Sequence, residues 1–474
     1  MCPGNPGYGK TILAASAIEE LQLLRPNHNT CYFFFRQGTP EASSPSQAYR
    51  SILAQVLKHC EDDDELIDKL IFSMNKGASG QPQATKNELL DTISLCASCE
   101  KIQYIVLDGV DECNDSLELL TDLCKTFETT SVRMIMFSRP HVKTPRAMSA
   151  IRYQDIGKCL SQDIKVYLFS RIDTMVEDDL LPPDVETRQL VERLLIGADG
   201  MFLWAALMMD YLCSSSLTRT KRLKEIQKIR SPEGLETMYE RILRQLSLQN
   251  LPDQDFASWV FMWLTFSSRS LSAKELEYTF TIRNANDEDA SIDFSDFNAT
   301  VVTTCGSLVE RGILYHPKSM MEYTGFRFIH LSVYEFFAAR LNTESCFFIL
   351  SKPDSHLVMT RAMLHYITLN IPRMLTERQR LSETDWELVE TQRMNDDFPF
   401  LDYAIVHWIQ HLRLSQEGSN GRIIADKGRD ANTVSVPHSL RKEGQDSRQS
   451  SATIVFQIIS SIQSIAATSA AFMQ

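Results

Sequence analysis

Apolar runs alternate with helix-patterned stretches along the first third of the chain. Four runs of β-forming residues stand out, Cys31–Phe35, Tyr104–Leu107, Val132–Phe137 and Ile151–Ile156, and helical periodicity separates them. Runs that are apolar throughout are typical of parallel strands whose two faces are both covered. The alternation therefore predicts a doubly wound α/β sheet.

Helical periodicity dominates the pattern after residue 157. Ser161 is a candidate N-cap for a helix that begins near Leu160, and the long apolar stretch Leu190–Leu212 is interrupted only by Gly200. We assign Met201–Met209 to core packing, because Met, Leu and Trp at helical spacing are far more often core than a ligand lining.

The remaining pattern divides the chain further. Residues 257–345 predict a helix pair and a short hairpin, which is the order of a winged helix, and the pattern is then helical as far as Trp408. The predicted domains are a nucleotide-binding domain (1–157), a helical domain (158–245), a winged-helix-like domain (246–345), a helical segment (346–413), a polar segment expected to be disordered (414–452) and an accessory helix (453–474).

Composition excludes several classes of protein. With 474 residues, 43% of them hydrophobic, the chain can bury a large core. A net charge of −13 argues against a nucleic-acid surface, and the predicted winged helix also carries more acidic than basic side chains. The chain starts without a signal-peptide pattern, and its 11 cysteines are scattered, so we expect a cytoplasmic protein without a membrane anchor.

The segment Gly4–Thr11 matches the phosphate-loop pattern G-x-x-x-x-G-K-[ST] and precedes a helical stretch, Ile12–Leu24. Glycines let the backbone wrap closely around a phosphate, and the helix directs its positive N-terminal end at the same anion. Lys10 is expected between the β- and γ-phosphates and the Thr11 hydroxyl on Mg²⁺. The expected nucleotide contacts are Gly4, Pro6, Gly7, Gly9, Lys10 and Thr11.

A second element supports this interpretation. The apolar run Tyr104–Leu107 ends in Asp108, as a buried parallel strand would when it delivers an acid to the carboxyl edge of a sheet. Asp108 is the expected Mg²⁺ ligand, and either Asp111 or Glu112 could orient and deprotonate the attacking water. Alone, an apolar strand ending in Asp is common; paired with the phosphate loop, it favours a nucleotide site.

Arg139 follows the predicted strand Val132–Phe137 and could sense the γ-phosphate.

Two other patterns could suggest metal sites, and we assign no metal to either. Cys96 and Cys99 form a single CxxC, which fits two cysteines one helical turn apart better than zinc. The acids of Glu61–Glu65 repel one another and usually mark a solvated segment.

Together these residues resemble the NACHT domain of fungal, nephrocystin-like STAND NTPases. The resemblance is carried by the phosphate loop, by Leu107–Cys113 and Phe137–Pro140, and by the later segments Gly197–Trp204, Leu235–Leu243 and Phe328–Phe337. It implies binding of ATP or ADP with Mg²⁺, GTP being left open, and slow hydrolysis. It also implies that His330 reaches the β-phosphate of ADP; the alternative for His330 is a core histidine whose hydrogen bonds are satisfied within the protein, before a helix.

The implied function is a nucleotide-dependent switch that controls protein assembly in fungal non-self recognition or innate-immunity-like signalling. The expected partners are proteins, including further copies of the chain through the NTPase module. An alternative is a non-hydrolysing interaction scaffold with a vestigial site. A small-molecule kinase fits poorly, because it gives the helical and winged-helix portion no role.

The chain departs from the family pattern at its N-terminus. Only Met1-Cys2-Pro3 precede Gly4, which are too few to form the strand that enters the loop. We therefore expect an N-terminally truncated chain, a sheet whose first strand is missing or incomplete, and an open apolar edge in its middle. Catalytic competence is left open for this reason.

Overall fold

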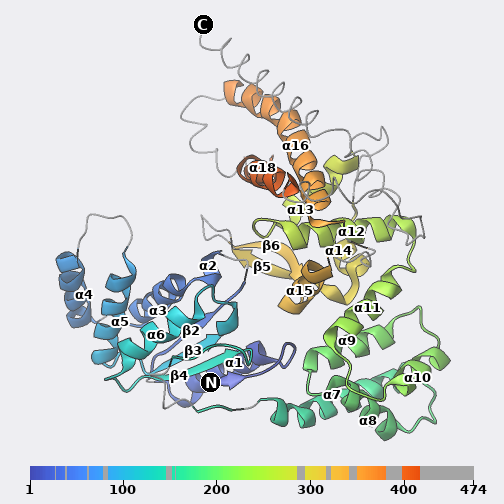
Figure 1. Ribbon diagram of the computed structural model, residues 1–474, viewed down its shortest axis with the longest axis horizontal. Coiled ribbons are helices and arrows are strands. Elements are labelled where there is room, and N and C mark those ends of the chain that lie inside the picture. The colour runs from blue at the N-terminus through green and yellow to red at the C-terminus, as the bar shows by residue number, and fades with distance from the viewer. Residues whose placement is uncertain are drawn as a thin grey trace, which may run out of the picture. The chain divides into compact units, whose positions relative to one another are not determined.

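The computed structural model describes residues 1–26, 28–37, 40–60, 63–77, 84–145, 152–154, 156–284, 294–315, 322–340, 348, 350–380 and 398–416. The chain divides into two compact units, Met1–Met238 and Tyr239–Gln474 (Figure 1). The predicted accessory helix, residues 417–452 of the predicted disordered segment, and Glu61 and Asp62 of the acidic run lie outside the described residues.

The first unit contains the predicted parallel sheet. Its strands are β1 (Cys2–Pro3), β2 (Thr30–Phe34), β3 (Tyr104–Asp108) and β4 (Arg133–Ser138), in the order β1-β4-β3-β2. Every pairing is parallel, with Phe34 opposite Asp108, and Pro3 opposite Ser138. The carboxyl ends of all four strands therefore meet at one edge, as the α/β prediction requires.

Two predictions about this sheet are wrong: that the residues before Gly4 are too few to form a strand, and that Ile151–Ile156 is a strand. Cys2–Pro3 do form a strand, and Gly4 N–H extends its pairing by donating to the Ser138 carbonyl at 3.0 Å. The predicted strand Ile151–Ile156 is not a strand in its described part, yet it bonds to the other side of the chain start: Gln154 N–H donates to Met1 O at 3.0 Å, and Met1 N donates to Arg152 O at 2.7 Å. The expected open gap is thus closed by backbone hydrogen bonds on both sides of Met1–Pro3.

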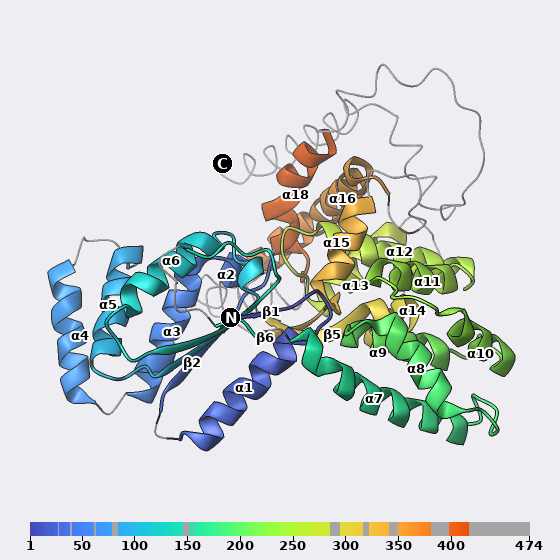
Figure 2. The same ribbon diagram turned by 60° about the horizontal axis from the view of Figure 1, so that its bottom comes forward.

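Helices cover both faces of the sheet (Figure 2). Alternation along β3 sends Ile105 and Leu107 into a core cluster on one face of the sheet, while Val106 faces the other side. On that other side α1 (Lys10–Leu24) buries Ala14 and Ile18. The helices between the strands are α2 (Pro40–Ser43), α3 (Pro45–His59), α4 (Asp64–Gly77), α5 (Lys86–Ser98) and α6 (Ser116–Phe127).

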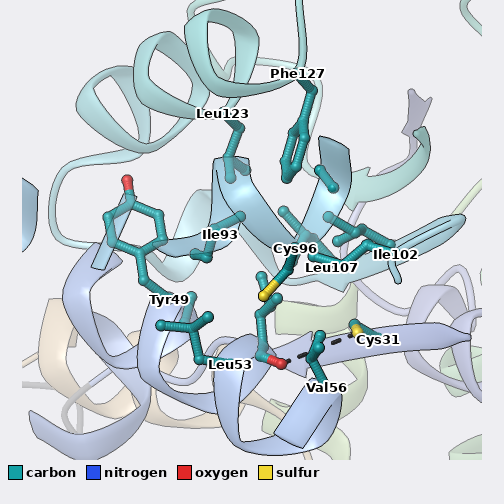
Figure 3. Close-up of a cluster of buried hydrophobic side chains, with 14 of the residues drawn as sticks. Cys31, Tyr49, Leu53, Val56, Ile93, Cys96, Ile102, Leu107, Leu123 and Phe127 are labelled. Carbon is teal, nitrogen blue, oxygen red and sulfur yellow. Dashed lines mark hydrogen bonds between the residues drawn. The ribbon is translucent and has the colours of Figure 1, made fainter. Parts of the chain in front are cut away.

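This core cluster joins α3, α5 and α6 to the sheet. Figure 3 shows Tyr49 and Val56 of α3 facing Cys96 of α5, with Leu123 of α6 above them. Local signals start these helices: the Ser44 side chain accepts from Gln47 N–H, and a capping box opens α5. This packing fixes the strands whose ends carry the candidate site.

The rest of the first unit is helical. Its helices are α7 (Gly157–Glu177), α8 (Thr187–Ala198), α9 (Phe202–Cys213) and α10 (Arg219–Lys228), and α11 (Leu235–Leu246) spans the boundary with the second unit. Trp204, Met208 and Met209 of α9 are fully buried, which confirms the packing role predicted for this stretch. Gly197 lets the Trp204 ring approach, since a Cβ there would lie 2.6 Å from it.

The second unit contains three helices, a hairpin and further helices. Trp259, Phe261 and Trp263 of α12 are buried in its aromatic core. The predicted helix pair and hairpin are both present, with a third helix, Phe297–Cys305, between them, and the winged-helix assignment stays a prediction. The elements are α12 (Leu251–Phe266), α13 (Ala273–Asn284), α14 (Phe297–Cys305), the antiparallel strands β5 (Val309–Tyr315) and β6 (Glu322–Phe328), α15 (Leu331–Arg340), α16 (Lys352–Arg380) and α18 (Leu401–Gln416).

None of the helices in the described part of the chain is both long enough and apolar enough to span a bilayer.

Candidate nucleotide site

The phosphate loop runs from β1 into the first turn of α1. Gly7 and Gly9 have φ values of 81° and 68°, in the left-handed region where a side chain is strained. Gly9 is the N-cap of α1, and its carbonyl accepts the first helical bond from Leu13 N–H at 3.0 Å. The first N–H groups of α1 have no partners within the helix, so this end of the loop is suited to an anion.

Lys10 lies against its own loop. Its Nζ donates to the carbonyl of Gly4 at 2.9 Å and to that of Asn5 at 3.0 Å. Burial lowers the pKa of Lys10, and the nearby acids Asp111 and Asp108 act in the opposite direction. The ammonium is thus held at the loop within a mainly acidic surrounding.

Thr11 and Asp108 meet, although 97 positions separate them in the chain. The Thr11 hydroxyl donates to Asp108 Oδ2 at 2.7 Å. Asp108 is 5% exposed, and burial raises its pKa above the usual range. Its second oxygen, Oδ1, is buried without a hydrogen-bond partner among the described residues.

This donor set fits Mg²⁺. A buried carboxylate oxygen without a partner is costly unless something binds it. Mg²⁺ is usually held by one or two carboxylates together with phosphate oxygens and water, rather than by a cage made only of protein. In the described part of the chain, no group of three or more His, Cys, Asp or Glu side chains is placed to hold a metal ion.

Asp111 and Glu112, which the sequence leaves as alternatives for the base, have different partners. Asp111 Oδ1 accepts from Arg139 N–H at 2.8 Å, and its Oδ2 lies 3.1 Å from Arg139 Nε, so both of its oxygens are bound to Arg139. Glu112 Oε2 accepts from Gln37 N–H at 3.0 Å, and burial raises the Glu112 pKa. A carboxyl group with a raised pKa is better suited to accept a proton near neutral pH.

A cavity of about 700 Å³ adjoins the loop. Gly4, Asn5 and Tyr8 line it on the loop side, and Ile164 of α7 and Leu195 of α8 line it on the helical side. This volume lies within the usual range for small-ligand sites. Sequence reasoning missed Gln37, Ile164 and Leu195; only Gln37 carried a signal, because it follows a strand that ends at the same edge of the sheet.

His330 belongs to the second unit and begins the turn into α15. Its Nδ1 accepts from Ser332 N–H at 3.1 Å and lies 2.7 Å from Ser332 Oγ. An Nδ1 that accepts this bond leaves the proton of a neutral ring on Nε2. The contact of His330 with a nucleotide phosphate stays a prediction.

Comparisons with known proteins agree with this geometry. A family model described as "Nephrocystin 3, N-terminal" matches residues 1–139. The vegetative incompatibility protein HET-E-1 of Podospora anserina is 20% identical over 439 residues, which cover 86% of this chain and 30% of that protein. The chain thus spans less than a third of the length of this relative.

Two solved structures from Aeropyrum pernix show a weak likeness. The ORC1 protein in complex with DNA has a TM-score of 0.29 and 12% identity, covering 72% of this chain and 86% of its own. The ORC2 protein, as ADPNP-ADP complexes, has a TM-score of 0.30 and 14% identity, covering 69% and 83%. Likeness at this level transfers no property to this chain.

The loop, the Asp108 strand and the matched family model support one class, the P-loop NTPases. Within that class, the nephrocystin match and the similarity to HET-E-1 support an NTPase of the NACHT/STAND kind.

Proposed function

We propose that the chain is a nucleotide-dependent switch that binds ATP or ADP with Mg²⁺ and controls the assembly of proteins. The observation that carries the proposal is the Thr11–Asp108 hydrogen bond, together with the unpartnered Asp108 Oδ1. It joins the hydroxyl of the phosphate loop to the acid of β3 at the place where a nucleotide-bound Mg²⁺ needs oxygen ligands.

Each residue of the site has a part in this proposal. Lys10 binds the β- and γ-phosphates, and Thr11 and Asp108 hold Mg²⁺, which offsets the charge on the phosphate oxygens when it is bound. Glu112 orients the attacking water and accepts its proton. Asp111 pairs with Arg139, and Arg139 would contact the γ-phosphate.

Slow hydrolysis would then act as a timer that resets the switch, with the nucleotide state read by the helical and winged-helix portions. The similarity to a vegetative incompatibility protein supports a role in fungal non-self recognition. The net charge of −13 favours protein partners, including further copies of this chain, over nucleic acid. We place this function in the cytoplasm.

A second candidate is an interaction scaffold that binds nucleotide without hydrolysing it. It differs from the switch in having no residue that activates water. Steady ATP hydrolysis that Glu112→Gln abolishes, while leaving nucleotide affinity intact, would exclude the scaffold.

Equilibrium binding of ADP and of a non-hydrolysable ATP analogue, each with Mg²⁺, tests the switch. Lys10→Ala should weaken binding by about 100-fold, since it removes the charge-assisted contact with the phosphates. Lys228→Ala is the matched control, because Lys228 lies on α10 with its side chain 67% exposed, and it should leave affinity unchanged. Equal affinities for the wild type and Lys10→Ala would contradict the assignment of the loop.

A further inference from the structure

Helix α9 begins without a side-chain cap. The side chain of its N-cap residue, Met201, accepts no hydrogen bond from the backbone N–H groups of the first turn. The first four N–H groups of any helix need partners from outside the helix. One of these groups, Leu203 N–H, donates to the Gly7 carbonyl of the phosphate loop at 3.0 Å. The loop thus supplies an acceptor at the α9 N-terminus.

The next residue of the loop contacts the same turn. The Tyr8 hydroxyl donates to the Asp199 carbonyl at 3.2 Å. Asp199 and Gly200, which connect α8 to α9, both have left-handed backbones, with φ values of 45° and 79°. Consecutive residues of the loop are therefore bonded to both sides of one tight turn, and the cavity is lined by this turn as well as by the loop.

Glycine at position 7 is required by this approach. A Cβ on Gly7 would lie 3.0 Å from Leu203 Cβ and 3.4 Å from Leu235 Cδ1, whereas a Cβ on Gly9 would meet nothing within 4 Å. Both glycines have left-handed backbones, so the difference between them is the proximity of α9. The loop and α9 are packed closely enough that moving one displaces the other.

We propose that Leu203 is a positioning residue for the phosphate loop. Its N–H and its Cβ hold Gly7, and through Gly7 they set the backbone that carries Lys10 and Thr11. The part of this inference that concerns nucleotide rests on the proposed function. Since coupling between two equilibria is reciprocal, docking of α9 should raise nucleotide affinity, and bound nucleotide should protect the α9 N-terminus.

Residue-resolved hydrogen exchange at the Leu203 amide tests the contact without any need for nucleotide. The Leu203 amide should exchange slowly in the wild type, and about tenfold faster in Gly7→Ala, whose new methyl group separates the loop from α9. Lys10→Ala is the control: it should lose nucleotide affinity and keep the Leu203 amide protected, because the Gly7 carbonyl is untouched.

Nucleotide affinity provides the second measurement. Gly7→Ala should weaken binding of ADP with Mg²⁺ by about tenfold or more. The second change Leu203→Gly should restore part of that loss by removing the opposing Cβ, while the strain of an alanine at the left-handed backbone of position 7 remains. A double variant that binds as poorly as Gly7→Ala would overturn the positioning role. A fast-exchanging Leu203 amide in the wild type would overturn it too. A slow amide in a protein that binds no nucleotide would instead overturn the proposed function and the coupling, and leave only a structural contact.

Discussion

Each unit contains a group of buried polar side chains, and the two groups differ in how completely they are hydrogen-bonded. In the nucleotide site, Asp108 Oδ1 is buried and has no partner among the described residues. In the second unit, the Arg269 cluster comprises Ser268, Arg269, Glu275, His356, Tyr403 and His411. Across the described residues, no buried side-chain nitrogen or oxygen of that cluster lacks a partner.

The bonds of the Arg269 cluster connect several elements. Arg269 pairs with Glu275 through two contacts, of 3.0 Å and 2.6 Å, and Tyr403 Oη of α18 accepts from Ser268 N–H at 2.8 Å. His356 Nδ1 and His411 Nδ1 lie 2.8 Å apart. A network that is complete in itself fixes helices and has nothing left to offer a ligand, whereas a carboxylate with a free buried oxygen is available to one.

The largest expected effect is on the stability of the complete network. Glu275→Gln should lower the free energy of unfolding of the second unit by about 3 kcal/mol, because it leaves the buried Arg269 charge without its main partner. Glu310→Gln is the matched control: Glu310 pairs with Arg327, but both side chains are more than a third exposed, so the cost should stay below about 1 kcal/mol. Urea denaturation measures both, and equal costs would contradict the comparison.

The second prediction concerns pH, and the two groups should respond in opposite directions. Burial lowers the pKa of His356 to about 4 and that of His411 to about 3, from 6.5 in the unfolded chain. Below pH 6.5 the unfolded state therefore binds more protons, and the second unit loses stability as the pH falls toward 4. Between pH 7 and pH 5 the loss should be about 2–4 kcal/mol for the pair.

For the acids of the nucleotide site, stability changes with pH in the opposite direction. Burial raises the pKa values of Asp108 and Glu112, so the folded first unit binds protons more readily than the unfolded chain, and acidification favours it. Hydrogen exchange resolved by unit, measured at pH 7 and pH 5 without nucleotide, should show protection falling in the second unit and not in the first. The two units losing protection in parallel would refute this assignment, as would an unchanged pH response in His411→Gln.

Local patterns predicted the elements and the nucleotide motifs. The apolar run Tyr104–Leu107 ending in Asp108 corresponds to β3, because a strand buried on both faces has a composition that can be read directly. The two motifs also predicted that Thr11 and Asp108 lie at the same edge of the sheet, where the two side chains form a hydrogen bond. The prediction that no strand precedes Gly4 was wrong. A strand of two residues has no recognisable sequence pattern, and it is formed by hydrogen bonds to distant segments.

Contacts between residues far apart in the chain could not be predicted from the sequence for the same reason. The bond between Leu203 and Gly7 and the pair of His356 with His411 depend on how helices pack after they form. Neither contact leaves a trace in periodicity or composition. The proposed division of roles between Asp111 and Glu112 likewise depends on the contact of Asp111 with Arg139, which is not visible in the sequence.

The smallest expected effect is the most direct test of what an unpartnered buried oxygen means. Without nucleotide and Mg²⁺, Asp108→Asn should raise the free energy of unfolding of the first unit by about 1 kcal/mol, because it removes a charge that burial disfavours. Asp111→Asn should lower it instead, because Arg139 then loses its ion-pair partner.

With Mg²⁺ and ATP present, the order of wild type and Asp108→Asn should reverse. A ligand that binds only the folded state adds stability in proportion to the logarithm of its concentration over Kd, and Asp108→Asn forfeits that gain along with the metal ligand. Thermal denaturation of the wild type and Asp108→Asn, with and without MgATP, measures the stability difference between the two proteins under both conditions. If Asp108→Asn were less stable than the wild type under both conditions, Asp108 would be a structural residue like Glu275, and the distinction between the two groups would fail.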